Sequence, residues 1–230
     1  DDNTTASNNT AIGYAALAAN TTGTENSALG STALDANTTG AYNVAIGYDA
    51  LGSNTTANSN TAVGYEAMDT NTTGEYNVAV GKGALDGNTT ANDNTAVGYH
   101  ALLTNSTGVK NTAVGALSLD ASTTSDKNSA FGYSALGANT TGSDNTALGA
   151  YSMLANTTGT YNVAVGQGAL ESNTTASYNV AIGVGALQQN TSASMTAVGR
   201  NALNLNTTGT QNTAVGHKAL EANTTASYNT

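Results

Sequence analysis

Residues 60–76 read NTAVGYEAMDTNTTGEY, and residue 77 opens the near copy NVAVGKGALDGNTTAND. The phrase first begins at Asn9 and returns, one copy after another, as far as residue 228, which gives thirteen complete copies. Twelve copies have seventeen residues, and residues 179–194 form a shorter copy of sixteen. A period this short predicts a repeat array in which each unit packs only on its neighbours.

The domain organisation follows from this period. We expect one array over residues 1–230, with complete repeats in 9–228 and partial repeats at 1–8 and 229–230. Repeat arrays need atypical, polar terminal units to close their cores, and neither end has one. We therefore interpret the chain as a segment of a longer protein or fibre.

Composition narrows the function classes. The chain has 5 basic and 15 acidic residues and a net charge of −10, and its basic residues are scattered, so we expect no nucleic-acid partner. No apolar run approaches the roughly 18 residues of a membrane helix, so we expect no membrane partner within this segment. With no cysteine, the chain has neither disulfides nor thiolate metal sites.

Within the repeat, each position has its own rule. Counting from the opening residue, position 3 is always Ala, position 5 is always Gly, position 4 is Ile, Val, Leu or Phe, and position 9 is Leu or Met. Positions 6, 7, 10, 11, 16 and 17 vary and carry the charges. Positions 1–4 predict a short strand ending at a glycine turn, and NTT at positions 12–14 predicts a second strand. The piece between them predicts a third short strand or a tight turn.

These elements predict an all-β fold, a parallel β-solenoid (β-roll) of about thirteen coils with a 17-residue repeat. Coils stacked about 4.8 Å apart place each residue above its equivalent, so like residues form ladders. We expect each coil to bury two large apolar residues, at positions 4 and 9. Because that core is thin and positions 3, 5 and 8 are small, we expect self-association as a homotrimer or a filament.

The motif N-[TVS]-A-[IVLF]-G, as in NSALG at residues 26–30 and NVAIG at residues 43–47, resembles the head repeats of trimeric autotransporter adhesins. The longer phrase NTAVGY-x-AL-x-x-NTTG is similar to arrays in tail-fibre-type proteins of phages and bacteria. The adhesin resemblance implies a left-handed β-roll, trimeric packing and binding to host or matrix surfaces. The repeat here is longer than the 14 to 15 residues or so of adhesin heads, and it adds the NTT segment.

Residues that could support catalysis are few. His100 and His217 occupy variable positions nearly seven repeats apart, and carboxylates such as Asp69, Glu75 and Asp86 repeat in no fixed geometry. We expect these carboxylates to form a solvated face. No calcium repeat and no phosphate-binding loop occurs. We therefore expect no enzymatic activity, no cofactor and no metal.

Position 12 opens an N-x-[ST] sequon in every complete copy except one, which has Ser122. The asparagines are interpreted either as glycan acceptors or as a stacked ladder of amides, and the ladder is favoured because Asn recurs equally at position 1. Intact mass distinguishes the two interpretations. The candidate acceptors are Asn3, Asn20, Asn37, Asn54, Asn71, Asn88, Asn105, Asn139, Asn156, Asn173, Asn190, Asn206 and Asn223.

Tyrosine and threonine suggest surface roles. The tyrosines at position 6 either contact a ligand such as a sugar or cover the coil edge and a neighbouring chain. These candidate contacts are Tyr14, Tyr48, Tyr65, Tyr99 and Tyr133. Stacked threonines can order water on an ice-binding solenoid, but adjacent strand residues point to opposite faces, so NTT offers only one outward row.

Together these features predict a structural segment of an extracellular fibre or filament, located outside the cell or on a cell or virion surface. Its main partner is another copy of itself. The alternatives are an adhesin head, with a host surface, matrix or glycan as partner, and an ice-binding solenoid.

Overall fold

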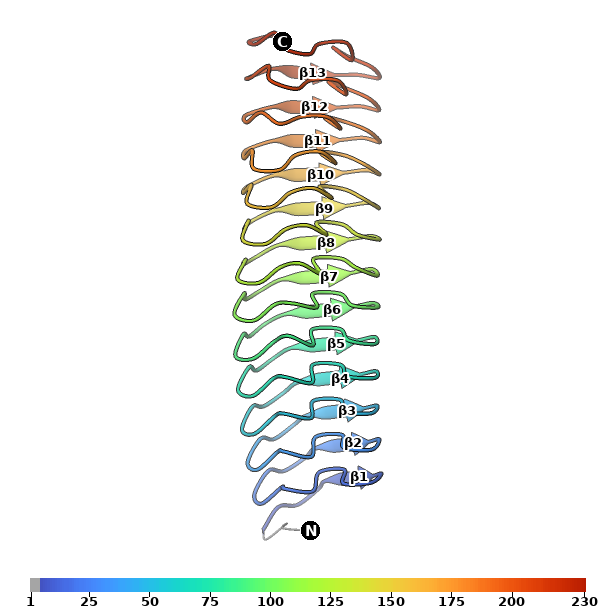
Figure 1. Ribbon diagram of the computed structural model, residues 1–230, viewed down its shortest axis with the longest axis vertical. Coiled ribbons are helices and arrows are strands. Elements are labelled where there is room, and N and C mark those ends of the chain that lie inside the picture. Colours follow the sequence, from blue (N-terminus) through green and yellow to red (C-terminus); the bar gives the residue numbers. More distant parts are fainter. Residues whose placement is uncertain (1–4) are drawn as a thin grey trace. The chain divides into compact units, whose positions relative to one another are not determined.

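The computed structural model describes residues 5–230, which contain thirteen β-strands of three residues each and no helix (Figure 1). The fold is an all-β parallel solenoid with one coil every 17 residues, which confirms the predicted fold class. Contacts divide the chain into two compact units, Asp1–Asn111 and Thr112–Thr230.

The first unit contains β1 (Thr10–Ile12), β2 (Ser27–Leu29), β3 (Val44–Ile46), β4 (Thr61–Val63), β5 (Val78–Val80) and β6 (Thr95–Val97). The second unit contains β7 (Thr112–Val114), β8 (Ser129–Phe131), β9 (Thr146–Leu148), β10 (Val163–Val165), β11 (Val180–Ile182), β12 (Thr196–Val198) and β13 (Thr213–Val215). Within each unit, strands that follow one another in the sequence are neighbours in the sheet.

The strand register pairs each residue with the equivalent residue of the next coil. Between β4 and β5, Ala62 pairs with Ala79 and Val63 with Val80. The short copy keeps this register, because Ala181 of β11 still pairs with Ala197 of β12. The predicted ladders are therefore present in both units.

Each described coil has one strand, so the prediction of a second strand at NTT is wrong. In the coil that begins at Asn26, the amides of Thr38 and Thr39 both donate to the Thr55 carbonyl, at 2.9 and 3.2 Å. A strand ladder uses alternate residues, and two consecutive donors to one acceptor instead produce a bend. The segment between the strand and NTT is a turn, one of the two predicted forms, so the described coils supply one sheet.

The coil closes through residues with positive φ. Gly81, at position 5, has φ of 133°, and an added Cβ there would lie 2.4 Å from the Gly98 carbonyl oxygen of the next coil. Positions 7, 9 and 17 also turn with positive φ, as at Glu66 (50°), Leu85 (55°) and Tyr76 (60°). Side chains occupy this region at a cost, so the bonds between coils must hold it.

Burial within the coil shows which residues form the core. Ala79, Ala84 and Leu85, at positions 3, 8 and 9, are fully buried. Val80, at position 4, is only half-buried, and Ile46 is 38% exposed. The expectation of two large buried apolar residues per coil is therefore wrong: alternation along the strand turns position 3 inward and positions 2 and 4 outward.

Two asparagine ladders complete the core. The backbone amide of Asn77, at position 1, donates to Asn60 Oδ1 at 2.9 Å, and Asn77 Nδ2 donates to the Ala91 carbonyl at 2.8 Å. Asn88, at position 12, donates from Nδ2 to Asn71 Oδ1 at 2.7 Å and to the same Ala91 carbonyl at 3.1 Å. Buried amides of this kind need partners, and the ladders supply them from the neighbouring coil.

Candidate interaction surface

The outward side chains at positions 2 and 4 of the strands form a surface that we call the β face. At position 4 of the second unit, Phe131 is 39% exposed and Leu148 is 49% exposed. Position 2 contributes Thr, Val or Ser, and neither position carries a charged residue in any complete repeat. Each unit therefore presents an uncharged and largely apolar row of side chains on its sheet.

Sequence reasoning did not find this face, although the signal was present. In a strand such as TAV or VAI, alternation turns the third residue outward whenever the alanine is inward. Apolar character alone predicts burial of both residues. Ala62 is fully buried, whereas Val63, which follows it, is half-buried.

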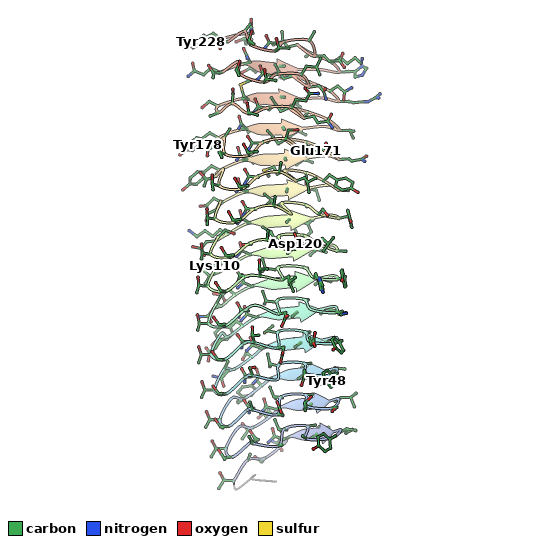
Figure 2. The ribbon with its side chains drawn as sticks, in the orientation of Figure 1. Tyr48, Lys110, Asp120, Glu171, Tyr178 and Tyr228 are labelled. Carbon is green, nitrogen blue, oxygen red and sulfur yellow. The ribbon has the colours of Figure 1, made fainter. Side chains whose placement is uncertain are left out.

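Tyrosines line the edges of the β face. Tyr48, at position 6, projects where the strands of the first unit end, and Lys110, at position 17, projects where they begin (Figure 2). Tyr48 and Tyr65 stack with ring centroids 5.3 Å apart, and Lys82 Nζ lies 5.3 Å from the centre of the Tyr65 ring.

The five tyrosines predicted as surface contacts are all exposed, but they do not form one site. The structure stacks Tyr48 on Tyr65, whereas Tyr99 stacks on His100 at 3.8 Å between centroids. Tyr133 meets Tyr151 edge-on at 5.4 Å, and Tyr14 is 82% exposed. These pairs cover coil edges, and a ligand role for the tyrosines stays a prediction.

The described asparagines at position 12 occupy the ladder. Those from Asn20 to Asn206 are at most 1% exposed, and Asn223 is half-buried. A glycan on a ladder asparagine requires its amide to leave the core, so the geometry favours the ladder interpretation. Asn3 lies outside the described residues, and glycosylation stays a prediction for intact mass.

The threonines at position 13 bond to the next coil, whereas those at position 14 face outward. Thr38 Oγ1 donates to the Thr55 carbonyl of the next coil at 2.9 Å, so position 13 belongs to the stack. Thr39 and Thr56, at position 14, are exposed. NTT therefore contributes one outward row of hydroxyl groups, although it is a bend and not the predicted strand.

Carboxylates of the first unit gather on one side of the turn. Burial, together with the charges of Asp49, Asp86, Glu66 and Asp35 in that order of effect, raises the pKa of Asp69 to about 6. Burial also raises the pKa of Asp86. The expectation of a fully solvated acidic face is therefore incomplete, because stacking brings these like charges together.

Neither histidine meets the other. His100 stacks on Tyr99, and His217 is exposed. Among residues 5–230, no three histidine, aspartate or glutamate side chains converge in a group suited to a metal ion. No helix in that part of the chain has the length and apolar character needed to span a membrane.

Comparison with known proteins yields no family. No protein-family model matches the chain, and no curated protein matches it. The resemblance to adhesin heads and tail fibres therefore rests on the quoted motifs and on the solenoid fold.

Proposed function

We propose that this chain is a structural segment of an extracellular fibre or filament, in which stacked coils provide length and the β face joins copies side by side. The observation that supports this proposal most directly is the uncharged β face. Apolar rows such as Val63, Val80 and Val97 point outward and are only half-buried within their unit. Exposed contiguous apolar surface of this kind favours an interface.

A second copy of the chain fits this face better than an unrelated partner. The rows repeat once per coil, and another copy has the same spacing, so each side chain meets an equivalent neighbour along the strip. The net charge of −10 opposes association elsewhere on the surface, whereas the β face carries no charge. The three-chain packing implied by the adhesin resemblance is one closed form of such contact.

The area of the β face determines how many coils a stable interface between two copies requires. Coils about 4.8 Å apart, each crossing about 20 Å when the edge residues at positions 17 and 6 are counted with the β face, offer about 100 Å² per coil. A stable interface needs about 800 Å² per partner, or about eight coils. Association is therefore expected to strengthen with the number of repeats.

The test is molar mass by light scattering over a range of concentrations. We expect a constant threefold mass for a closed trimer, or growth with concentration for a filament. The substitutions Val63→Glu, Val80→Lys and Val97→Glu place alternating charges on the β face, where adjacent opposite charges limit repulsion within the chain. We expect this triple variant to have the mass of a single chain.

A matched control carries the same charges on another face. The substitutions Thr56→Glu, Thr73→Lys and Thr90→Glu change exposed residues at position 14 and leave the β face intact. The control is expected to keep the parent mass. A parent chain that is monomeric at every concentration, or a control that dissociates equally, contradicts the proposal.

An ice-binding solenoid is the second candidate, and one observation favours it. The β face has two outward rows on a regular sheet, for example Thr61 and Val63 of β4. Position 2 alternates irregularly among Thr, Val and Ser, which weakens this interpretation. A thermal-hysteresis assay decides it, and the triple variant should lose any activity found.

A further inference from the structure

A pocket of about 280 Å³ opens in the second unit beside the edge of the β face, where Gln167 and Val184 at position 6 line one side of it. Tyr151, Glu171, Gln188 and Asn201 are among the side chains that line it. It lies on the row of side chains at position 7, which otherwise covers the turn after each strand.

Two consecutive glycines create this pocket. Position 7 is Gly168 in one coil and Gly185 in the next, between Tyr151 and Asn201 in the flanking coils. The single glycine Gly83 has a different neighbour: a Cβ there would lie 2.7 Å from His100 Cδ2, so an aromatic ring covers it. The open pocket is therefore a local feature of sequence, not a property of every coil.

Polar atoms converge over the two glycines. A Cβ on Gly168 would lie 3.1 Å from Glu171 Oε2, and one on Gly185 would lie 2.7 Å from Asn201 Oδ1. Gln188 Nε2 donates to Glu171 Oε2 at 2.6 Å, and Asn204 Nδ2 donates to Gln188 Oε1 at 3.0 Å. This chain of hydrogen bonds orients a carboxylate and amides toward one small volume.

An aromatic ring forms one end of the pocket. Tyr151 is 39% exposed, and the edge-on contact with Tyr133 at 5.4 Å restrains its ring. An apolar ring face beside convergent polar groups is the usual character of a small-molecule site.

We propose that this pocket binds one neutral sugar residue of a glycan. Its volume is close to the lower end of ligand pockets, about 300 Å³, which suits a single pyranose ring. The ring of Tyr151 can contact the C–H face of the sugar, and Glu171, Gln188 and Asn201 can accept and donate hydrogen bonds to its hydroxyls. The Glu171 carboxylate disfavours anionic sugars. This inference does not depend on the proposed self-association.

The test is saturation-transfer NMR on the full chain with glucose, galactose, mannose, N-acetylglucosamine, fucose and sialic acid as probes. We expect transfer to at least one neutral sugar and none to sialic acid. Loss of the ring in Tyr151→Ala should weaken binding by about tenfold, given that an aromatic contact contributes up to about 1.5 kcal/mol. Glu171→Gln should weaken it as well.

A filling variant tests the pocket itself. Gly168→Asn places a side chain over the floor while keeping a residue that tolerates positive φ, as Asn201 does at the same position with φ of 56°. The matched control is Gly83→Asn in the first unit, at the equivalent position. Circular dichroism and thermal unfolding show that each variant is folded.

The outcomes separate clearly. Binding that Gly168→Asn abolishes and Gly83→Asn preserves supports the site. The proposal is overturned if no probe receives transfer from the parent chain, or if a folded Gly168→Asn variant binds as well as the parent.

Discussion

At the scale of the residue, the main feature of this coil is the number of backbone positions with positive φ. The sequence predicts the role of glycine at position 5, because its invariance before a variable segment indicates a turn. It does not predict Leu85 with φ of 55°, since a left-handed leucine costs about 1–2 kcal/mol in isolation. The neighbouring coil explains it: the Leu85 amide donates to the Ala101 carbonyl at 3.0 Å.

Gly81→Ala tests the close approach of coils at position 5. The new methyl would meet the Gly98 carbonyl at 2.4 Å, and φ of 133° disfavours any side chain. We expect a loss of about 3 kcal/mol or more in unfolding free energy, measured by hydrogen exchange of the flanking coils. Gly137→Ala is the control, because its nearest contact is 3.3 Å and its φ is not positive, and an equal loss there would contradict the explanation.

The coil is the element of this fold, and its length controls the ladders. In the 16-residue coil, Asn190 Nδ2 donates to the Ser192 carbonyl, two residues away, where other coils reach three residues ahead. Asn173 Oδ1 and Asn179 Nδ2 are buried without a hydrogen-bond partner in this region. The sequence locates the irregular copy, but the orphaned atoms can be identified only from the geometry.

Another irregular coil is compensated only in part, because the missing asparagine leaves Asn105 Oδ1 of the preceding coil buried without a hydrogen-bond partner. Ser122 replaces the ladder asparagine, and position 15 of the same coil is Ser125, whose Oγ lies 2.6 Å from Ser122 Oγ. Asn128 and Asn139 both donate to Ser125 Oγ, at 3.0 and 3.2 Å. The second serine therefore replaces an acceptor within the buried network, a link that the sequence pattern alone did not indicate.

Restoring the full length should stabilise the short coil. We expect a gain of about 2 kcal/mol when residues 190–195 are replaced by NTTASYN, the sequence of residues 173–179, because each buried unpaired group costs about 1–3 kcal/mol. Hydrogen exchange of residues 179–203 measures this gain in local unfolding free energy. The same replacement at residues 139–145, in a regular coil, should change little; a gain of equal size there would point to general propensity instead.

At the scale of the whole molecule, stacking of the repeats brings negative charges close together, which opposes folding. The chain carries a net charge of −10, and stacking brings Asp49, Glu66 and Asp86 toward Asp69. The sequence predicts the charged positions as outward, which holds for most of them. It cannot predict the half-burial of Asp69, because that depends on which side chains occupy the coils above and below.

Asp69 makes stability depend on pH. Its folded pKa of about 6 lies above the ordinary 3.8, so the folded chain binds a proton more tightly than the unfolded chain between those values. Stability should therefore rise as pH falls from 7 through about 6, and the gain should level off near 4. Asp69→Asn should raise stability at pH 7 by less than about 1 kcal/mol, since the carboxyl is partly exposed and water screens the repulsion.

Thermal unfolding of the parent and of Asp69→Asn across pH 4–7 measures this dependence. The variant should show the flatter profile. Glu75→Gln serves as a control on a different edge of the same coil and should retain the parent profile. A parent midpoint that falls steadily from pH 7 to pH 5 would refute the assigned direction.

The coil-to-coil register has a consequence for inheritance. Since each coil meets its neighbours through equivalent residues, a copying error in the gene that adds or removes one whole repeat rebuilds the same interfaces, as the pairing of Val63 with Val80 rebuilds that of Ile46 with Val63. Such an error changes the length of the array without creating a new junction. Array length is therefore a trait that recombination can adjust in single steps, and the surface residues at the variable positions are free to diverge between copies.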